Sequence, residues 1–250
     1  MTDIVRVGLV DSGALPEQRE AVAAATAFVY EDERLVSIEA QPDILGHGGA
    51  VLAIVRHLAP EARFHIAQVF HARHVTTAAQ VVAAIDWLVE TGVDLINLSL
   101  GLREHRPALE MACRRACAAG VVLCAATPAR GAPVFPAAYE DVWRMTGDAR
   151  CSRHEISSLM TPHADFGAHV LPLPFAGNGH GGASMGCAHM SGHIAALLAW
   201  HEAPSRADPA RLRDWLRERL RQQARYHGPE QRSSRAGSSG NPSSGKVSQM

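Results

Sequence analysis

The chain has 250 residues, of which 47% are hydrophobic, enough apolar material for a globular domain with a substantial core. Its 24 basic and 25 acidic residues give a formal net charge of −1, which argues against nucleic acid and anionic membrane surfaces as partners. Five cysteines are an odd number, and no basic and then apolar segment opens the chain, so we expect a reducing, cytoplasmic setting. No apolar run approaches the roughly 20 residues that cross a bilayer.

Strand and helix patterns alternate through the first half of the chain. IVRVGLVDSG is typical of a buried strand that places Asp11 at its carboxyl end, and GHGGAVLAIVRHLAP is typical of a helix with His47 in its first turn. In chain order we expect a strand at 4–13, a helix at 16–27, two strands around a polar turn at 28–40, a helix at 46–60, a strand at 63–70, a helix at 76–92 and a strand at 93–101.

The alternation continues to about residue 127 and then gives way to loops rich in glycine and proline, a composition typical of loops that shape a surface site. Such alternation predicts an α/β fold of three layers, αβα, with a mostly parallel sheet whose ligands gather beyond the carboxyl ends of the strands. We expect further elements as a helix at 106–120, a strand at 121–127, a buried helix at 184–200 and a basic amphipathic helix at 208–226.

The stretch GNGHGGASMGCAHMSGH, residues 177–193, places four glycines before Ser184 and then continues as a helix. A serine at the start of a helix is usually an N-cap that binds a free backbone amide, and the stretch alone favours that interpretation. The second interpretation is a nucleophile at a tight turn, whose developing oxyanion would be bound by the same free amides.

Three chemically complementary side chains are predicted at the ends of core elements: Asp11, His47 and Ser184. A serine is a weak nucleophile until a base takes its proton, and histidine is the base whose pKa lies near neutrality. A buried carboxylate can fix the tautomer and orientation of that histidine. These residues could therefore form a catalytic triad if the elements that carry them meet at one edge of the sheet.

Four blocks in order resemble the motifs of the subtilisin-like (S8) serine protease family: VGLVDSG for its aspartate strand, GHGGAVLAIV for its histidine helix, INLSLG for its substrate-binding strand and GASMGCAHMSGHIAALL for its serine helix. The resemblance covers roughly residues 4–220 and implies a subtilisin-like catalytic domain at 1–227, followed by a disordered tail at 228–250 that lacks apolar periodicity. It implies that Asp11, His47 and Ser184 act as a triad. It also implies that an extended peptide substrate binds the backbone of Ser99, Leu100 and Gly101.

The chain departs from the family pattern at the segment that completes the oxyanion hole. The family carries an asparagine where this chain has Pro128, in AATP, and proline offers neither a side-chain donor nor a backbone N–H. Loss of one such donor costs roughly 10²–10³ in rate, so we expect slow general proteolysis. The Ser184 amide remains as one donor, and Thr127 and Asn178 are candidates for the other. Ala188 also replaces a proline of the family, below the nucleophile.

Other histidines have simpler interpretations than a metal site. His189 and His193 lie four residues apart but lack the glutamate of the H-E-x-x-H zinc motif, so packing within the helix is favoured. His65, His71 and His74 have no ligand partners at metal spacing, and we predict that they lie on the surface.

The cysteines are likewise interpreted as small packing residues. Cys113 and Cys117 share one side of a predicted helix, and Cys187 follows Ser184 by three residues without a feature that marks it as a nucleophile. We expect neither a metal nor a cofactor.

The interpretation that joins these observations is an intracellular serine endopeptidase with an atypical oxyanion hole that removes a leader peptide from one partner polypeptide. The chain opens almost directly at the aspartate strand, without the signal and pro-domain of secreted relatives. A narrower resemblance, to the maturation proteases of quinohemoprotein amine dehydrogenase, implies that the substrate is the small-subunit precursor of an amine dehydrogenase.

Two alternatives remain. A catalytically weak or inactive subtilase could bind a peptide along residues 99–101 without cutting it, and the altered oxyanion segment favours this alternative. A phosphate-binding protein is disfavoured, because residues 177–182 lack the Lys-Ser/Thr pair of a P-loop.

Overall fold

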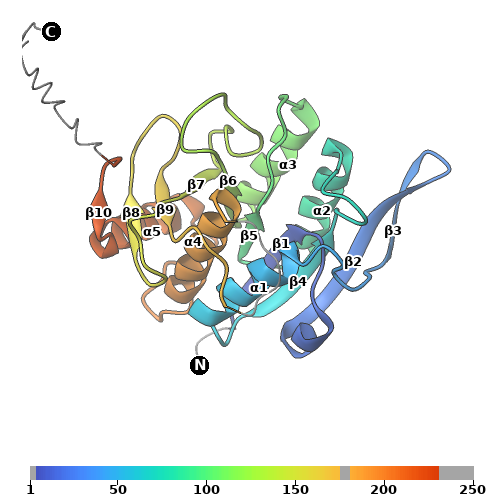
Figure 1. Cartoon of the computed structure of the whole chain (residues 1–250), viewed down its shortest axis with the longest axis horizontal. Helices are drawn as coiled ribbons and strands as arrows, with labels where there is room; N and C mark the ends of the chain where they lie inside the picture. Colours follow the sequence, from blue (N-terminus) through green and yellow to red (C-terminus); the bar gives the residue numbers. More distant parts are fainter. Residues whose placement is uncertain (1–3, 175–180, 231–250) are drawn as a thin grey trace, which may run out of the picture.

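The computed structural model describes residues 4–174 and 181–230, which form a central sheet between two layers of helices (Figure 1). Helices α1 (His47–Leu58), α4 (Ala183–Leu198) and α5 (Pro209–Gln223) contribute to one core of buried residues on one face of the sheet. Helices α2 (Ala78–Glu90) and α3 (Pro107–Ala118) cover the other face over a second core. The predicted three-layer αβα fold is confirmed.

The sheet has ten strands in the order β10 (Tyr226–His227), β8 (Ile156–Ser158), β9 (Phe166–Ala168), β7 (Trp143–Gly147), β6 (Val122–Ala126), β5 (Leu95–Leu98), β1 (Arg6–Asp11), β4 (Arg63–Gln68), β2 (Val22–Glu31) and β3 (Arg34–Glu39). The run from β9 to β2 is parallel throughout. Antiparallel pairs join β2 to β3 at one edge, where the hairpin projects from the body in Figure 1, and β8 to β9 near the other. The sheet is therefore mostly parallel, as predicted.

The parallel register brings the carboxyl ends of the central strands to one level. Asp11, the last residue of β1, is aligned with Gln68 at the end of β4. Val10 is aligned with Leu98 at the end of β5, so Ser99 follows β5 directly beside Asp11. In an open parallel sheet this is the edge where ligands bind.

One predicted helix is wrong. Residues 16–27 form a short 3₁₀ helix, η1 (Pro16–Ala21), and then enter β2. Alanines in this stretch have a high helix propensity, but pairing with β4 overrides it, because Ala24 and Ala25 align with His65 and Ile66. The other predicted helices, and the strands before residue 128, are confirmed with small differences at their ends.

Three further features can be set beside the expectations from the sequence. Among residues 4–174 and 181–230, no helix is long and apolar enough to span a membrane. Most of the predicted tail, residues 231–250, lies outside the described residues. All of the cysteines are free thiols: Cys113, Cys117, Cys124, Cys151 and Cys187.

Helix α4 lies against β7 where Gly186 meets the backbone of Thr146. A Cβ added at Gly186 would collide with the Thr146 carbonyl oxygen, so a side chain cannot be placed there without moving the helix. We predict that Gly186→Ala lowers the free energy of unfolding by about 1–3 kcal/mol, the usual cost of an overpacked core. Urea denaturation measures this, with Met111→Ala at an exposed position of α3 as the control that should change little. An unchanged midpoint for Gly186→Ala would contradict this packing.

Candidate active site

Asp11 and His47 form a buried pair at the carboxyl edge of the sheet. The Nδ1 atom of His47 lies 2.7 Å from the Oδ1 atom of Asp11, whose side chain is fully buried, while that of His47 is 16% exposed. The Ser12 amide donates to the same Oδ1 atom at 2.8 Å, whereas Oδ2 is buried without a hydrogen-bond partner among the described residues. A carboxylate in this position holds a proton on Nδ1 and leaves Nε2 as the basic nitrogen.

The turn before α1 explains why the sequence places His47 opposite that carboxylate. Gly46 has a left-handed backbone, with φ of 74°, and ends the turn directly before the helix. Sequence reasoning missed Asp43, although an aspartate three residues before a glycine is a recognisable turn signal. Its carboxylate closes the turn by accepting three amide hydrogen bonds of 2.8–3.0 Å, from Leu45, Gly46 and Gly49.

Gly48 brings the start of α1 against the loop that follows β1. A Cβ added at Gly48 would collide with the Gly13 carbonyl oxygen, so a larger residue would push the helix away. The Gly48 amide donates to the Ser12 hydroxyl at 2.9 Å. The glycines after His47 therefore fix the first turn of α1 next to Asp11.

The pKa of His47 is raised above its ordinary value of 6.5. Burial is the largest single influence and lowers this pKa, but the charge of Asp11, its hydrogen bond to the imidazole and the charge of Asp43 together outweigh burial. The imidazolium form is thus stabilised, as a general base requires once it has taken up a proton.

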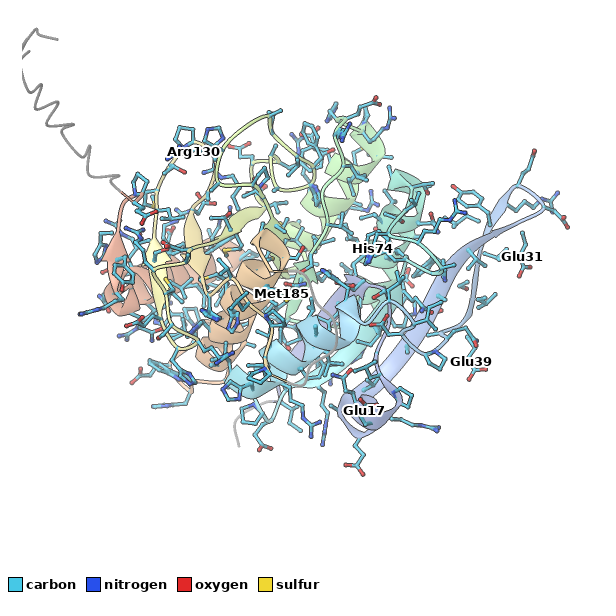
Figure 2. All side chains as sticks on the ribbon, in the orientation of Figure 1. Glu17, Glu31, Glu39, His74, Arg130 and Met185 are labelled. Atoms are coloured by element: carbon cyan, nitrogen blue, oxygen red, sulfur yellow. The ribbon has the colours of Figure 1, made fainter. Side chains whose placement is uncertain are left out.

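Ser184 occupies the first turn of α4 and is joined to Ser99 by two reciprocal hydrogen bonds. The Ser184 hydroxyl donates to the Ser99 carbonyl at 3.2 Å, and the Ser99 hydroxyl donates to the Ser184 carbonyl at 3.2 Å. Because Ser99 follows β5, which neighbours β1, this link brings Ser184 to the edge that holds Asp11 and His47. Figure 2 labels Met185, the residue after Ser184, in the central part of the molecule. The Ser184 hydroxyl is here bonded to a carbonyl and not to an imidazole nitrogen.

A chain of buried side-chain hydrogen bonds supports this link from below. Ser191, about two turns further along α4, donates to Asn97 Oδ1 at 2.9 Å, and Asn97 Nδ2 donates to the Ser99 hydroxyl at 2.9 Å. Asn97 and Ser191 are fully buried, so no solvent can replace either partner. Sequence reasoning missed both residues, and the signal that could have indicated them is a polar residue inside the apolar strand INLSL.

The start of α4 offers one anion-binding amide. Ser184 is the second residue of the helix, so its amide has no partner within the helix and can bind a negatively charged oxygen. Thr127 is less available, because its amide donates to the Met145 carbonyl at 2.8 Å and its hydroxyl lies 3.5 Å from the Pro128 carbonyl. Asn178, the other candidate donor, lies outside the described residues.

The segment after β5 has the form expected of a peptide-binding edge. Ser99 and Leu100 are buried, yet the amides of Ser99, Leu100 and Gly101 donate no backbone hydrogen bond within the described part of the chain. Leu102 then pairs with Phe135 through two backbone hydrogen bonds of 2.7 and 2.8 Å, which fixes the end of the segment. An added peptide strand could accept hydrogen bonds from those amides of the segment that face it, which alternate along an extended chain.

Three histidines were expected on the surface, and this prediction is wrong for His65. His65 is buried on β4, a central strand covered on both faces, and burial lowers its pKa. His71 is half-buried, with Nε2 3.1 Å from the Phe28 carbonyl. His74 is exposed, and its ring packs edge-on against that of His47 with 5.8 Å between the centroids.

His189 on α4 is fully buried, and His193, one turn further along the helix, is half-buried. The pKa of each is lowered to about 4, chiefly by burial, so both are neutral at pH 7. His189 Nε2 lies 3.2 Å from the Leu171 carbonyl, and its ring packs edge-on against that of His169. No group of three or more His, Cys, Asp or Glu side chains within 4–174 and 181–230 could hold a metal ion.

Cys187 lies about one turn of α4 below Ser184. It is fully buried, and burial raises the pKa of its thiol well above the ordinary value. A buried, protonated thiol is a poor nucleophile. Ser184 is thus better suited than Cys187 to react with a bound peptide.

Comparison with known families and proteins agrees with this geometry. The Subtilase family (Peptidase_S8) matches residues 5–138 of the chain. The thermostable alkaline protease of Halalkalibacterium halodurans is 26% identical over 89% of this chain and 63% of its own length. The minor extracellular protease Epr of Bacillus subtilis is 25% identical over 87% of this chain and 34% of its own length. Subtilisin DY of Bacillus licheniformis is 28% identical over 62% of this chain and 61% of its own length. The chain thus spans less than two thirds of the length of these relatives.

Two solved structures share the fold. The protease domain of PatA, solved as a serine-to-alanine mutant, is 20% identical with a TM-score of 0.59, over 77% of this chain and 78% of that chain. The prenylagaramide maturation protease PagA is 20% identical with a TM-score of 0.55, over 77% of this chain and 74% of that chain.

The raised pKa of His47 gives a direct test of its pairing with Asp11. We predict that the imidazole titrates above pH 6.5 in an NMR titration, and that Asp11→Asn moves the midpoint down because only the smaller influence of Asp43 then opposes burial. The pair stabilises the fold fully below the unfolded pKa of about 6.5, and this contribution is lost as the pH rises through the folded pKa. Asp86→Asn, which removes an exposed carboxylate paired with Arg115, is the control. A midpoint unaffected by Asp11→Asn would show that the pair does not form.

Proposed function

The chain belongs to the subtilase family, and from this premise we propose that it is a serine endopeptidase with Ser184 as nucleophile, His47 as base and Asp11 as the orienting carboxylate. The observation that carries the proposal is the 2.7 Å contact between a fully buried aspartate and a histidine, at the sheet edge where a serine begins α4. Residues 1–227 would form the catalytic domain.

In the proposed mechanism, the Ser184 side chain rotates from the Ser99 carbonyl to His47 Nε2. His47 takes the hydroxyl proton as Ser184 Oγ bonds to the scissile carbonyl carbon, Asp11 stabilises the imidazolium, and the Ser184 amide binds the oxyanion. The intermediate then collapses, the C–N bond breaks, and His47 gives its proton to the leaving amine. Water activated by His47 hydrolyses the acyl-enzyme and restores the serine.

Peptide binding can itself start the rotation of Ser184. The carbonyl that holds its hydroxyl belongs to Ser99, in the segment that we propose binds substrate with Leu100 and Gly101. An extended peptide that donates an N–H to this carbonyl weakens its hold on the Ser184 hydroxyl and frees the hydroxyl to turn toward His47. A substrate that binds poorly along 99–101 would leave the serine in its resting position.

The oxyanion segment supports a dedicated enzyme. Pro128 provides no donor and the Thr127 amide is already bonded, so generic peptides should be acylated slowly, at a cost of roughly 10²–10³ in rate. An adequate rate would then depend on contacts far from the scissile bond, which a whole partner polypeptide can make and a short peptide cannot. We therefore propose removal of a leader from one partner.

The most specific candidate for that partner is the small-subunit precursor of an amine dehydrogenase, which rests on the sequence resemblance described above. PagA is named as a maturation protease, but at 20% identity its likeness supports the fold and not a substrate. We place the reaction in the cytoplasm, because five free thiols suit a reducing compartment.

A second candidate function is peptide binding without cleavage. It is favoured by Pro128 and by the resting contact of the Ser184 hydroxyl with Ser99 rather than with His47. The buried Asp11 and His47 pair favours catalysis, because a binding protein has no need to hold a carboxylate against an imidazole inside the protein.

Mapping of new amino termini distinguishes these functions. The purified protein is incubated with lysate of its host, with the candidate precursor, with casein and with chromogenic tetrapeptides, and Ser184→Ala is the matched control. We expect one cut at one site in one polypeptide, absent with Ser184→Ala, and no turnover of casein or the tetrapeptides. Many cuts in unrelated proteins would point to a general protease. Retention of a polypeptide without any cut would point to the binding function.

A further inference from the structure

The loops around the candidate site carry far more positive than negative charge. These loops follow β4, β5 and β6, at residues 69–77, 99–106 and 127–133. The chain as a whole has a net charge of −1, so the excess of basic residues in these loops departs from its nearly neutral average. The ionisable side chains of the three loops are Arg73, Arg103, Arg106, Arg130, His71, His74, His105 and a single acidic residue, Glu104.

Most of this positive charge is not neutralised by neighbouring carboxylates. Arg106 pairs with Glu104, but Arg73, Arg103 and Arg130 are exposed and form no ion pair within the described residues. The carboxylates closest to the site are engaged already: Asp11 is bound by His47, and Asp43 by three backbone amides. We call the three arginines Arg73, Arg103 and Arg130 the cationic rim.

The cationic rim lies on the three loops that follow β4, β5 and β6, at the carboxyl edge of the sheet where a peptide is expected to bind. His74 packs against the ring of His47, and Arg73 precedes it in the loop after β4. Arg103 follows the segment 99–101 by two residues, and Arg130 follows Pro128, at the expected oxyanion segment, by two.

From this charge and placement we infer that the site takes a polypeptide segment with Asp or Glu side chains close to the scissile bond. The inference rests on the proposed function and deepens it by naming the chemistry of the substrate. Arginine binds carboxylates through a planar fork of N–H donors, and it stays charged at every physiological pH. Positive charge around a binding site also speeds the encounter with an acidic segment and slows that with a basic one.

Binding of labelled peptides to the Ser184→Ala protein tests the inference without any chemistry. The probes are peptides of one length with Glu, Gln or Lys at the same positions, and a single-stranded oligonucleotide of the same charge as the Glu peptide, each followed by fluorescence anisotropy. An exposed ion pair changes affinity by up to about five-fold, so three arginine contacts should favour the Glu over the Gln peptide by about tenfold. The preference should shrink as salt screens the charges.

Two triple variants separate the cationic rim from net charge. Arg73→Glu with Arg103→Glu and Arg130→Glu should abolish or reverse the preference. The control changes Arg34, Arg211 and Arg221 to Glu, three exposed positions that form no ion pair among the described residues. It alters the net charge by the same amount and should preserve the preference for the Glu peptide. The inference is overturned if Glu and Gln peptides bind alike, if the rim variant keeps the preference, or if the oligonucleotide binds as tightly as the Glu peptide. Failure of the wild-type protein to cut any polypeptide would refute the proposed function alone.

Discussion

The site depends on one constraint, a carboxylate that is buried away from solvent at the end of β1. Asp11 is fully buried, and an isolated buried charge is too costly to persist without partners. The Ser12 amide and His47 supply those partners on one oxygen. Their placement requires the closed turn at Asp43 and a glycine at position 48, because any side chain there would push α1 off the loop after β1.

The nucleophile is positioned by separate elements through a different kind of interaction. Neutral hydrogen bonds run from Ser191 through Asn97 and Ser99 to Ser184, and they tie α4 to β5. The parallel register of β1 and β5 then joins the two halves, since Asp11 and Ser99 follow aligned residues of neighbouring strands. A site assembled in this way depends on sheet register more than on any single loop. The loops, which carry the cationic rim, are therefore free to determine the substrate.

Much of the site could be predicted from the sequence because its members have strong local signals. Asp11 ends a β-branched run, His47 and Ser184 stand among glycines at helix starts, and their order matches a known family. What could not be predicted depends on tertiary contacts. The alanines after residue 22 became a strand because β4 offered a pairing partner, and His65 was buried because its strand is central. The hydrogen bond between Asn97 and Ser191 joins residues that are 94 positions apart, beyond the reach of a local pattern.

The central claim is that Ser184 is a nucleophile activated by His47 and Asp11, and covalent labelling tests it most directly. The protein is treated with a fluorophosphonate, and the adduct is located by intact mass and peptide mapping over a time course. The account predicts a single adduct on Ser184, none with Ser184→Ala, and labelling slowed by up to roughly 10⁴ with Asp11→Asn, the scale seen when a triad carboxylate is lost. No adduct, an adduct on Cys187 or another residue, or an unchanged rate with Asp11→Asn would contradict it.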